Sequence, residues 1–317
     1  MSRRLLLILG DQLDRESAAL RACDKGEDRV LMIESREEST RVWSHKARTA
    51  LFLAAMRHHR DWLKRAGYRV DYVEIGQPEA ESFASALSAA LHRHEPQRLL
   101  MTGAGEFGVQ QTVDSACAAA DTDCEVVTDS HFLCTREQFD DWRGGRKTLV
   151  MEHFYRHMRQ RDDILMVDGE PAGGQWNYDK ENRKPFGREG PGMTPQVPGY
   201  AADRTTRGVL RDVQRQFPDN PGRLDRFDWP VSREQALEML DDFVGHRLAA
   251  FGPYQDAMWT DAPFLHHSLL SSALNLKLLS PREVIDAAVN AAWDRRAPLQ
   301  SVEGFVRQIL GWREFVR

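Results

Sequence analysis

The sequence predicts an α/β fold followed by an all-α region, and three observations carry this prediction. Over the first 127 residues, five short apolar runs alternate with longer segments of helical periodicity. Such alternation is typical of a parallel sheet with helices on both faces. From residue 204 onward the periodic segments are helical, and a stretch rich in Gly and Pro at 169–199 separates the two patterns. We expect a Rossmann-like, doubly wound parallel five-stranded sheet, and helices after it.

The expected strands lie at 4–10, 29–34, 70–75, 98–102 and 124–127, and the helices between them at 46–66, 79–94 and 109–119. Ligands of such sheets bind outside the carboxyl ends of the strands. Polar residues occupy those ends here: Asp11 and Gln12 after the first strand, and the runs 34–38 and 102–106 after the second and fourth. Gly103 and Gly105 lack the third glycine of a dinucleotide fingerprint and follow the fourth strand, so we assign them no ligand.

The middle of the chain, 135–161, is expected to be largely helical and is rich in Arg. His153 and His157 would share a helix face, as metal ligands can. A third ligand is not evident, so a surface or interface pair is favoured and no metal is expected within this chain. The loop that follows holds recognition-type side chains, among them Trp176, Asn182 and Arg183. It is either a solvated loop packed by Trp176 or a binding surface.

Two features mark helices in the second half. Ser232, with Gln235 at the capping-box position, predicts a helix over 234–248. Ser268 is expected to be the N-cap of a further helix, whose first free N–H groups could hold a phosphate. A last helix is expected over 302–316, with one apolar stripe formed by Phe305, Ile309, Trp312 and Val316. These helices are either an ordinary packed pair or half of a cofactor cup.

Composition excludes some classes of protein. The chain has 317 residues, 41% of them hydrophobic, which is enough for one large or two ordinary domains. Its net charge of −5 does not predict nucleic-acid binding, so any DNA contact needs a local basic patch. The longest apolar run, 51–56, is far shorter than the ~20 residues of a membrane helix, and the N-terminus lacks the apolar length of a signal peptide. Four cysteines without a Cys-x-x-Cys pair favour a cytoplasmic protein with reduced thiols.

Five long motifs of mixed composition extend the interpretation. They are RRLLLILGDQLD near the start, EHFYRHMR and QWNYDKENRKP in the middle, and HSLLS and VEGFVRQILGWREFVR towards the end. Together they resemble the photolyase/cryptochrome family, and most closely its bacterial iron–sulfur branch, the deoxyribodipyrimidine photolyase-related proteins of the prokaryotic (6-4) photolyase type. The resemblance spans the whole chain.

The resemblance implies three sets of site residues. The HSLLS segment matches the phosphate-binding segment of the family, and Trp312 and Arg313 match a helix beside the flavin. The full FAD set implied is Tyr254, His267, Ser268, Leu269, Leu270, Ser271, Gln308, Trp312 and Arg313. An antenna pigment, expected to be a ribityl-lumazine, would be held by Gly10, Asp11, Glu34 and Glu38. DNA contacts are expected from Lys147 and Arg183.

The resemblance also implies a domain plan: an antenna-pigment domain at 1–132, a helix and long connector at 133–208, and the first part of a helical FAD-binding domain at 209–317. Family members continue beyond the helix that contains Trp312. The remainder of the flavin cup and the iron–sulfur ligands are therefore expected beyond Arg317, which makes the helical domain incomplete in this chain.

The function implied is that of a lyase: a light-dependent, FAD-containing photolyase that repairs a (6-4) photoproduct or a pyrimidine dimer in UV-damaged DNA, acting as a monomer away from membranes. Two alternatives stay open. One is a blue-light photoreceptor of the cryptochrome type without repair activity. The other is a non-enzymatic α/β module that binds a small ligand.

Overall fold

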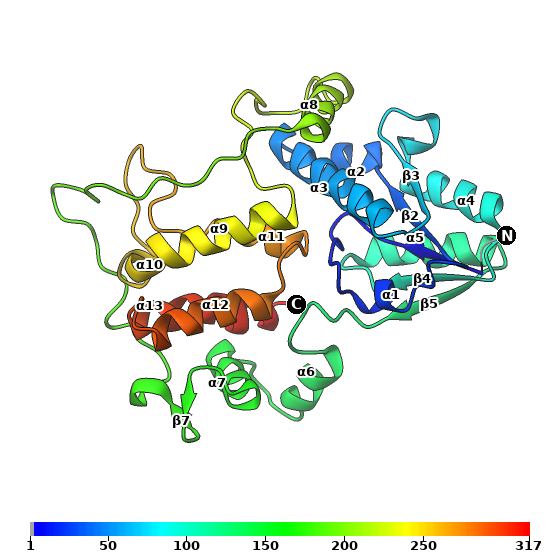
Figure 1. Ribbon diagram of the computed structural model, residues 1–317. Coiled ribbons are helices and arrows are strands. Elements are labelled where there is room, and N and C mark those ends of the chain that lie inside the picture. Colours follow the sequence, from blue (N-terminus) through cyan, green and yellow to red (C-terminus); the bar gives the residue numbers. More distant parts are fainter. Residues whose placement is uncertain (1–2) are drawn as a thin grey trace. The chain divides into compact units, whose positions relative to one another are not determined.

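Five parallel strands form the centre of the first of two units in the computed structural model, which describes residues 3–317 (Figure 1). They are β1 (Arg4–Leu7), β2 (Arg29–Ile33), β3 (Val70–Val73), β4 (Arg98–Thr102) and β5 (Asp123–Val127), in the order β3-β2-β1-β4-β5. Leu6 of β1 pairs with Val30 on one side and with Leu100 on the other. The predicted fold class, a doubly wound five-stranded parallel sheet followed by helices, is confirmed.

Helices cover the sheet because its strands are apolar on both faces. On one face, alternate strand residues such as Leu5 and Leu31 form a buried cluster with apolar residues of α4 (Phe83–His94) and α5 (Phe107–Ala119). The residues between them, such as Leu6 and Met32, point the other way and are also buried, as expected for a sheet covered on both sides. The unit also contains α1 (Ala18–Arg21), α2 (Arg36–Thr40), α3 (Lys46–Arg65) and the 3-10 helix η1 (Pro78–Glu81).

The predicted element boundaries are close to the observed ones, with two informative differences. The first strand ends at Leu7 rather than at residue 10, and the freed residues form a loop that Gln12 ties to the end of β4 by donating to the carbonyls of Thr102 and Gly103. The helix expected at 79–94 is divided into η1 and α4, because Ser82 is extended and caps α4 by accepting from the Ser85 N–H.

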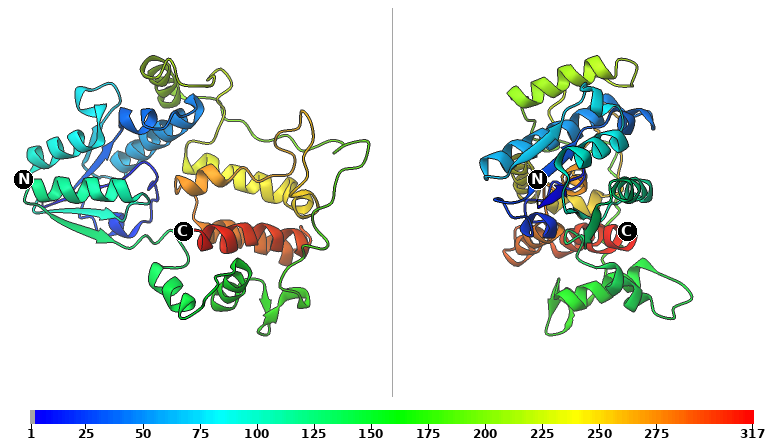
Figure 2. Two further views of the ribbon diagram at one scale, coloured as in Figure 1. Left: turned by 180° about the vertical axis from the view of Figure 1, so that it is seen from behind. Right: turned by 90° about the vertical axis from the view of Figure 1, so that its right-hand side faces the viewer.

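The second unit is helical. It contains α6 (Arg136–Arg143), α7 (Met151–Asp162), a small hairpin of β6 (Met166–Val167) and β7 (Glu170–Pro171), and the 3-10 helix η2 (Ala172–Gly174). Its later helices are α9 (Arg233–His246), α10 (Leu248–Tyr254), α11 (Ser271–Asn275), α12 (Pro281–Trp293), α13 (Leu299–Val306) and the π-helix η3 (Arg307–Arg313). The start of α9, up to Gln235, and the last residue of α11, Asn275, belong to the first unit. Helices α12 and α13 lie side by side (Figure 2). Glycine at 252 lets α10 contact α13, since an added Cβ there would lie 2.6 Å from Ser301 Cα.

The two units are not contiguous in sequence. The first comprises the residues up to Ser130, Gly199–Gln235 and Asn275–Leu278, and the second comprises the rest. The predicted domain plan, with ranges 1–132, 133–208 and 209–317, stays a prediction. These ranges divide α8 (Arg204–Gln216) between the connector and the helical domain, whereas α8 belongs to the first unit, where it packs on α3. Between residues 3 and 317, no helix is both long and apolar enough to cross a membrane.

The stripe predicted for the last helix is wrong in its second half. Phe305 and Ile309 are buried, but Trp312 is 48% exposed and Val316 is 71% exposed. The α-helix ends at Val306 and continues as the π-helix η3. Because a π-helix bonds residues five apart rather than four, a spacing of three or four residues no longer keeps side chains on one face.

Candidate functional site

A cavity of about 430 Å³ lies at the carboxyl ends of β1, β2 and β4, within the first unit. The chain passes from β1 outward to β3 and then returns to place β4 on the other side of β1. Such a reversal of strand order opens a crevice at the strand ends, where ligands of α/β sheets bind. The cavity volume is within the range of small-molecule sites, about 300–1,000 Å³. The strand ends predicted from sequence therefore meet at one site.

The cavity combines apolar walls with carboxylates. Phe52 and Met56, one turn apart on α3, form part of one wall, and Gly10 adjoins them, with 3.1 Å between an ideal Cβ and the Met56 sulfur. The acidic residues around it are Asp11, Glu34, Glu37, Glu38 and Glu106. Such a lining suits a ligand with a flat apolar part and with hydroxyl groups that donate to carboxylates.

Three polar groups of the lining are available for a ligand. The Ser35 hydroxyl is buried and has no hydrogen-bond partner among the described residues. Burial raises the pKa of Asp11, which Lys277 opposes, while Asp129 and Glu106 raise it further. Partial burial likewise raises the pKa of Glu38, against the effect of Arg41. An unpaired hydroxyl beside two carboxylates fits the ribityl chain of the expected antenna pigment, because each can accept from a hydroxyl.

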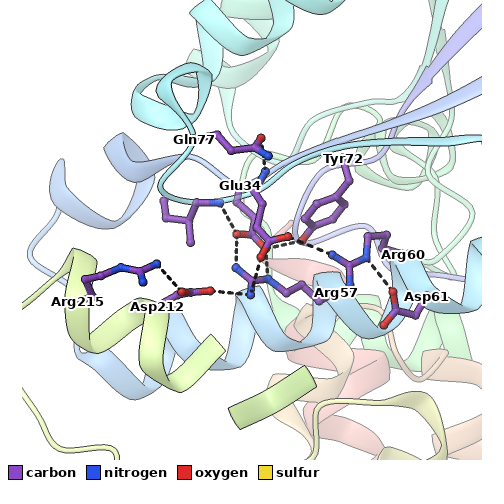
Figure 3. Close-up of polar contacts among 10 residues, drawn as sticks. Glu34, Arg57, Arg60, Asp61, Tyr72, Gln77, Asp212 and Arg215 are labelled. Carbon is purple, nitrogen blue, oxygen red and sulfur yellow. Dashed lines mark hydrogen bonds and ion pairs between the residues drawn. The ribbon is translucent and has the colours of Figure 1, made fainter. Parts of the chain in front are cut away.

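Glu34 also lines the cavity, but its acceptors are occupied (Figure 3). Its Oε1 accepts from Arg57 Nε at 2.8 Å and from the Tyr72 hydroxyl at 2.6 Å. Its Oε2 accepts from Arg57 Nη2 at 2.9 Å and from the Ile75 N–H at 2.7 Å. Arg57 also donates to Asp212 of α8 at 2.8 Å. The structure thus argues against the antenna role predicted for Glu34, which holds β2, β3 and α3 together.

An ion pair joins two loops at the cavity. Arg41, after α2, lies 2.5 Å from Glu106, which precedes α5, and both residues line the cavity. Two largely exposed aromatic residues are their near neighbours in sequence, Trp43 at 71% and Phe107 at 77%. Sequence reasoning missed Ser35, Arg41, Phe52 and Met56. Only the spacing of the last two, one helical turn apart on a helix that follows a strand end, was a usable signal.

In the second unit, the segment 267–271 differs from its prediction. Helix α11 begins at Ser271, so Ser268 is not its N-cap; the Ser268 hydroxyl instead accepts from the Leu270 N–H at 3.4 Å. The reason is Leu269, whose φ of 58° places it in the left-handed region and ends any helical path there. Arg247, fully buried, fixes the segment by donating to the His267 carbonyl at 2.7 Å.

Polar groups near this segment fit a polar ligand such as FAD. Ser271 is exposed, and the Ser272 hydroxyl is buried without a hydrogen-bond partner among the described residues. Tyr254 stacks on Phe186 at 4.6 Å and on His266 at 5.7 Å between ring centroids. His266 Nδ1 is buried and has no hydrogen-bond partner within residues 3–317. Burial lowers the pKa of this imidazole, and His267 and Arg247 add to the effect. Neutral His266 therefore offers one further polar atom.

The three residues of η3 in the predicted FAD set have different surroundings. Gln308 is exposed and donates to the Gly304 carbonyl at 3.0 Å. Trp312 is half exposed. Arg313 stacks on Phe132 at 4.1 Å, and its Nη2 lies 3.0 Å from His131 Nδ1. Arg313 thus packs the end of the chain against the segment that precedes α6.

The two DNA candidates differ in their surroundings. Lys147 is exposed in the loop between α6 and α7. Arg183 is half exposed, has a φ of 64°, and pairs with Asp179 at 3.5 Å and Asp256 at 3.1 Å. In the described part of the chain, His153 and His157 belong to no group of three or more metal-binding side chains.

Comparisons with known proteins give one consistent result. The sequence profile of the family described as "Deoxyribodipyrimidine photo-lyase-related protein" matches residues 6–229. A protein of Agrobacterium fabrum named "(6-4) photolyase" is 41% identical over 315 residues, which is 99% of this chain and 62% of the relative. An uncharacterized protein, R853, of Acanthamoeba polyphaga mimivirus is 40% identical over 65 residues, 20% of this chain and 50% of its own.

A solved structure agrees at the level of the fold. The crystal structure of a bacterial class III photolyase from Agrobacterium tumefaciens matches with a TM-score of 0.59 at 16% identity, over 99% of this chain and 58% of that one. The chain thus spans about three fifths of the length of the photolyases that it matches.

Proposed function

Because the chain belongs to the family of deoxyribodipyrimidine photo-lyase-related proteins, we propose that it is a light-dependent, FAD-containing DNA repair photolyase or a part of one, with (6-4) photoproducts as its substrate. The observation that carries this proposal is the 41% identity, over 99% of the chain, to a relative named as a (6-4) photolyase. The cavity at the strand ends supports it, since a second, antenna chromophore needs a site of that size.

The second unit would hold FAD. Bound FAD supplies the electron transfer that repair requires, and the protein positions it and excludes water. In this chain, hydroxyls of Ser268 and Ser271 and the free N–H groups of the first turn of α11 would bind the phosphates. Arg247 keeps that segment in place through the His267 carbonyl. Tyr254 would contribute an aromatic surface, with Leu269, Leu270 and the η3 residues Gln308, Trp312 and Arg313 as further contacts.

The first unit would hold a ribityl-lumazine. Asp11 and Glu38 would accept hydrogen bonds from its ribityl hydroxyls, and the Ser35 hydroxyl would gain the partner that it lacks. Phe52 and Met56 would cover the heterocycle. Lys147 and Arg183 would contact phosphates of UV-damaged DNA, whose lesion must leave the base stack to reach the flavin. We also propose that the protein is cytoplasmic and monomeric.

Repair of defined lesions tests this function. Oligonucleotides with a single (6-4) photoproduct or a single cyclobutane dimer are incubated with the protein in blue light and in darkness, and products are separated by chromatography. We expect light-dependent restoration of the (6-4) substrate. Flavin that is retained and photoreduced without repair of either lesion would contradict the proposal and favour a photoreceptor of the cryptochrome type.

A further inference from the structure

A network of buried charges holds the loop at 176–184 against the helices of the second unit. Glu303 of α13 is fully buried, and its Oε2 accepts from the Tyr178 N–H at 3.1 Å. Arg159 of α7, 1% exposed, donates to the Trp176 carbonyl at 2.9 Å. Asn182, 4% exposed, donates to the Gln300 carbonyl at 3.0 Å. Buried bonds of this kind are costly to break, so the loop is fixed at three points.

Asp179 links this buried network to the surface. One of its oxygens pairs with Arg307, which is 5% exposed and begins η3, and Arg307 also faces Glu303 at 3.4 Å. The other oxygen of Asp179 faces Arg183 at 3.5 Å. The hydrogen bond from Arg307 lowers the pKa of Asp179, so this carboxylate stays ionised. A single carboxylate is therefore shared between a buried and an exposed arginine.

Arg183 itself is held in an unusual position. Its backbone is left-handed, next to the anchored Asn182, and its side chain is 54% exposed and lies between two carboxylates. Asp256, 61% exposed, is the second, at 3.1 Å. The exposed lysines Lys180 and Lys184 flank the same turn.

The two carboxylates that pair with Arg183 differ in how firmly they are held in place. Exposed ion pairs contribute little to stability, so an incoming anion can replace Asp256. In the pair of Asp179 with Arg307, the arginine is buried and the carboxylate is 33% exposed. Removal of one partner from a pair with a buried arginine costs more than removal of one from an exposed pair. Asp179 therefore stays where it is when Asp256 is displaced.

We infer that Asp179 is a positioning residue that presents Arg183 to a DNA phosphate, and that Asp256 occupies the place of that phosphate until DNA binds. This inference rests on the proposed function in one respect, that DNA is the partner. It assigns opposite roles to Asp179 and Asp256, the two acidic residues that contact Arg183. Loss of Asp256 removes a competitor, whereas loss of Asp179 removes the support.

Binding of fluorescent duplex DNA in darkness, measured by anisotropy over a range of salt concentrations, tests the inference without flavin or repair. R183A sets the baseline and should lower the slope of log affinity against log salt by about one. D256N should tighten binding about two- to five-fold, as expected for loss of an exposed ion pair. D179N should weaken binding towards the level of R183A, although it also removes a negative charge.

E181Q is the matched control, because it removes one negative charge two residues from Arg183. Glu181 is exposed and is not one of the two carboxylates that pair with Arg183. The effect of D256N should exceed that of E181Q and vanish in the R183A background, where D179N should also add no further loss. D179E, which keeps the charge, should recover part of the affinity. If D179N tightens binding as D256N does, or if D256N does not tighten it, the inference is wrong. Because the assay needs neither light nor a lesion, its failure is distinct from a failure of the repair test.

Discussion

Glu34 in the first unit and Glu303 in the second are both buried carboxylates that face an arginine. Glu34 accepts four hydrogen bonds, which use both of its oxygens. Glu303 accepts one short bond, from the Tyr178 N–H through Oε2 at 3.1 Å, while its Oε1 faces Arg307 at 3.4 Å. Burial raises the pKa of Glu303, and Arg307, the Tyr178 N–H and the Tyr155 hydroxyl only partly offset this effect.

The difference indicates what each carboxylate does. A fully bonded group such as Glu34 belongs to the scaffold that shapes the cavity, and no acceptor is left for a ligand. An incompletely bonded group in a buried network is less usual, and it lies beside the loop that carries Arg183. Glu34 thus supports the fold of the first unit, whereas Glu303 lies next to a proposed binding surface in the second.

The largest expected effect is on Glu34. E34Q leaves the buried Arg57 without its main partner, so we expect the free energy of unfolding to fall by about 3–5 kcal/mol. Urea denaturation measures this. E37Q, an exposed neighbour on α2, should stay within about 0.5 kcal/mol of the wild type. A loss below about 1 kcal/mol for E34Q would show that the four bonds are not the main support of this region.

Glu303 should make the free energy of unfolding depend on pH. Its pKa is above the ordinary 4.5, so the folded state keeps this proton to higher pH than the unfolded state does. As pH rises from about 4.5 through the raised pKa, the wild type should lose stability relative to E303Q, by about 1.4 kcal/mol for each pH unit that separates the pKa values of the folded and unfolded states. Above the raised pKa the difference should be constant. Urea denaturation of both proteins from about pH 4 to about pH 8 measures it, and a relative gain by the wild type would contradict the assignment.

Asp11 tests whether the cavity carboxylates other than Glu34 provide the acceptors for a ligand. D11N should lower the affinity for a ribityl-lumazine about 10- to 100-fold, the value of a hydrogen bond to a charged acceptor. Fluorescence titration measures this affinity. D14N is the matched control, since Asp14 lies three residues away and does not line the cavity. Equal losses in D11N and D14N would indicate a general electrostatic effect instead of a contact.

The smallest effect is expected for the ion pair between Arg41 and Glu106. Both side chains are about half exposed, so E106Q should lower the free energy of unfolding only slightly, and less at high salt. Thermal unfolding at two salt concentrations measures it. A loss above about 2 kcal/mol, insensitive to salt, would mean that this pair supports the scaffold as Glu34 does.

The sheet was predictable because each strand is a short apolar run, and the position of the cavity followed from where those runs end. Partners far apart in sequence were not predictable. Arg57 is 23 residues from Glu34, and Asp212 is 155 residues from Arg57. Two backbone features also escaped the patterns: the left-handed Leu269, which delays α11, and the π-helix η3, which turns Trp312 outward. Both depend on tertiary contacts, since nothing in local propensity favours them.

Identification of the bound pigments tests the central claim most directly, namely that the first unit binds an antenna chromophore and the second binds FAD. The purified protein is denatured, and its released pigments are separated by chromatography and quantified by absorption. We expect both FAD and a ribityl-lumazine from the wild type, and FAD with little lumazine from D11N. Release of lumazine without FAD, or of no pigment at all, would contradict the claim that this chain is a photolyase-type flavoprotein.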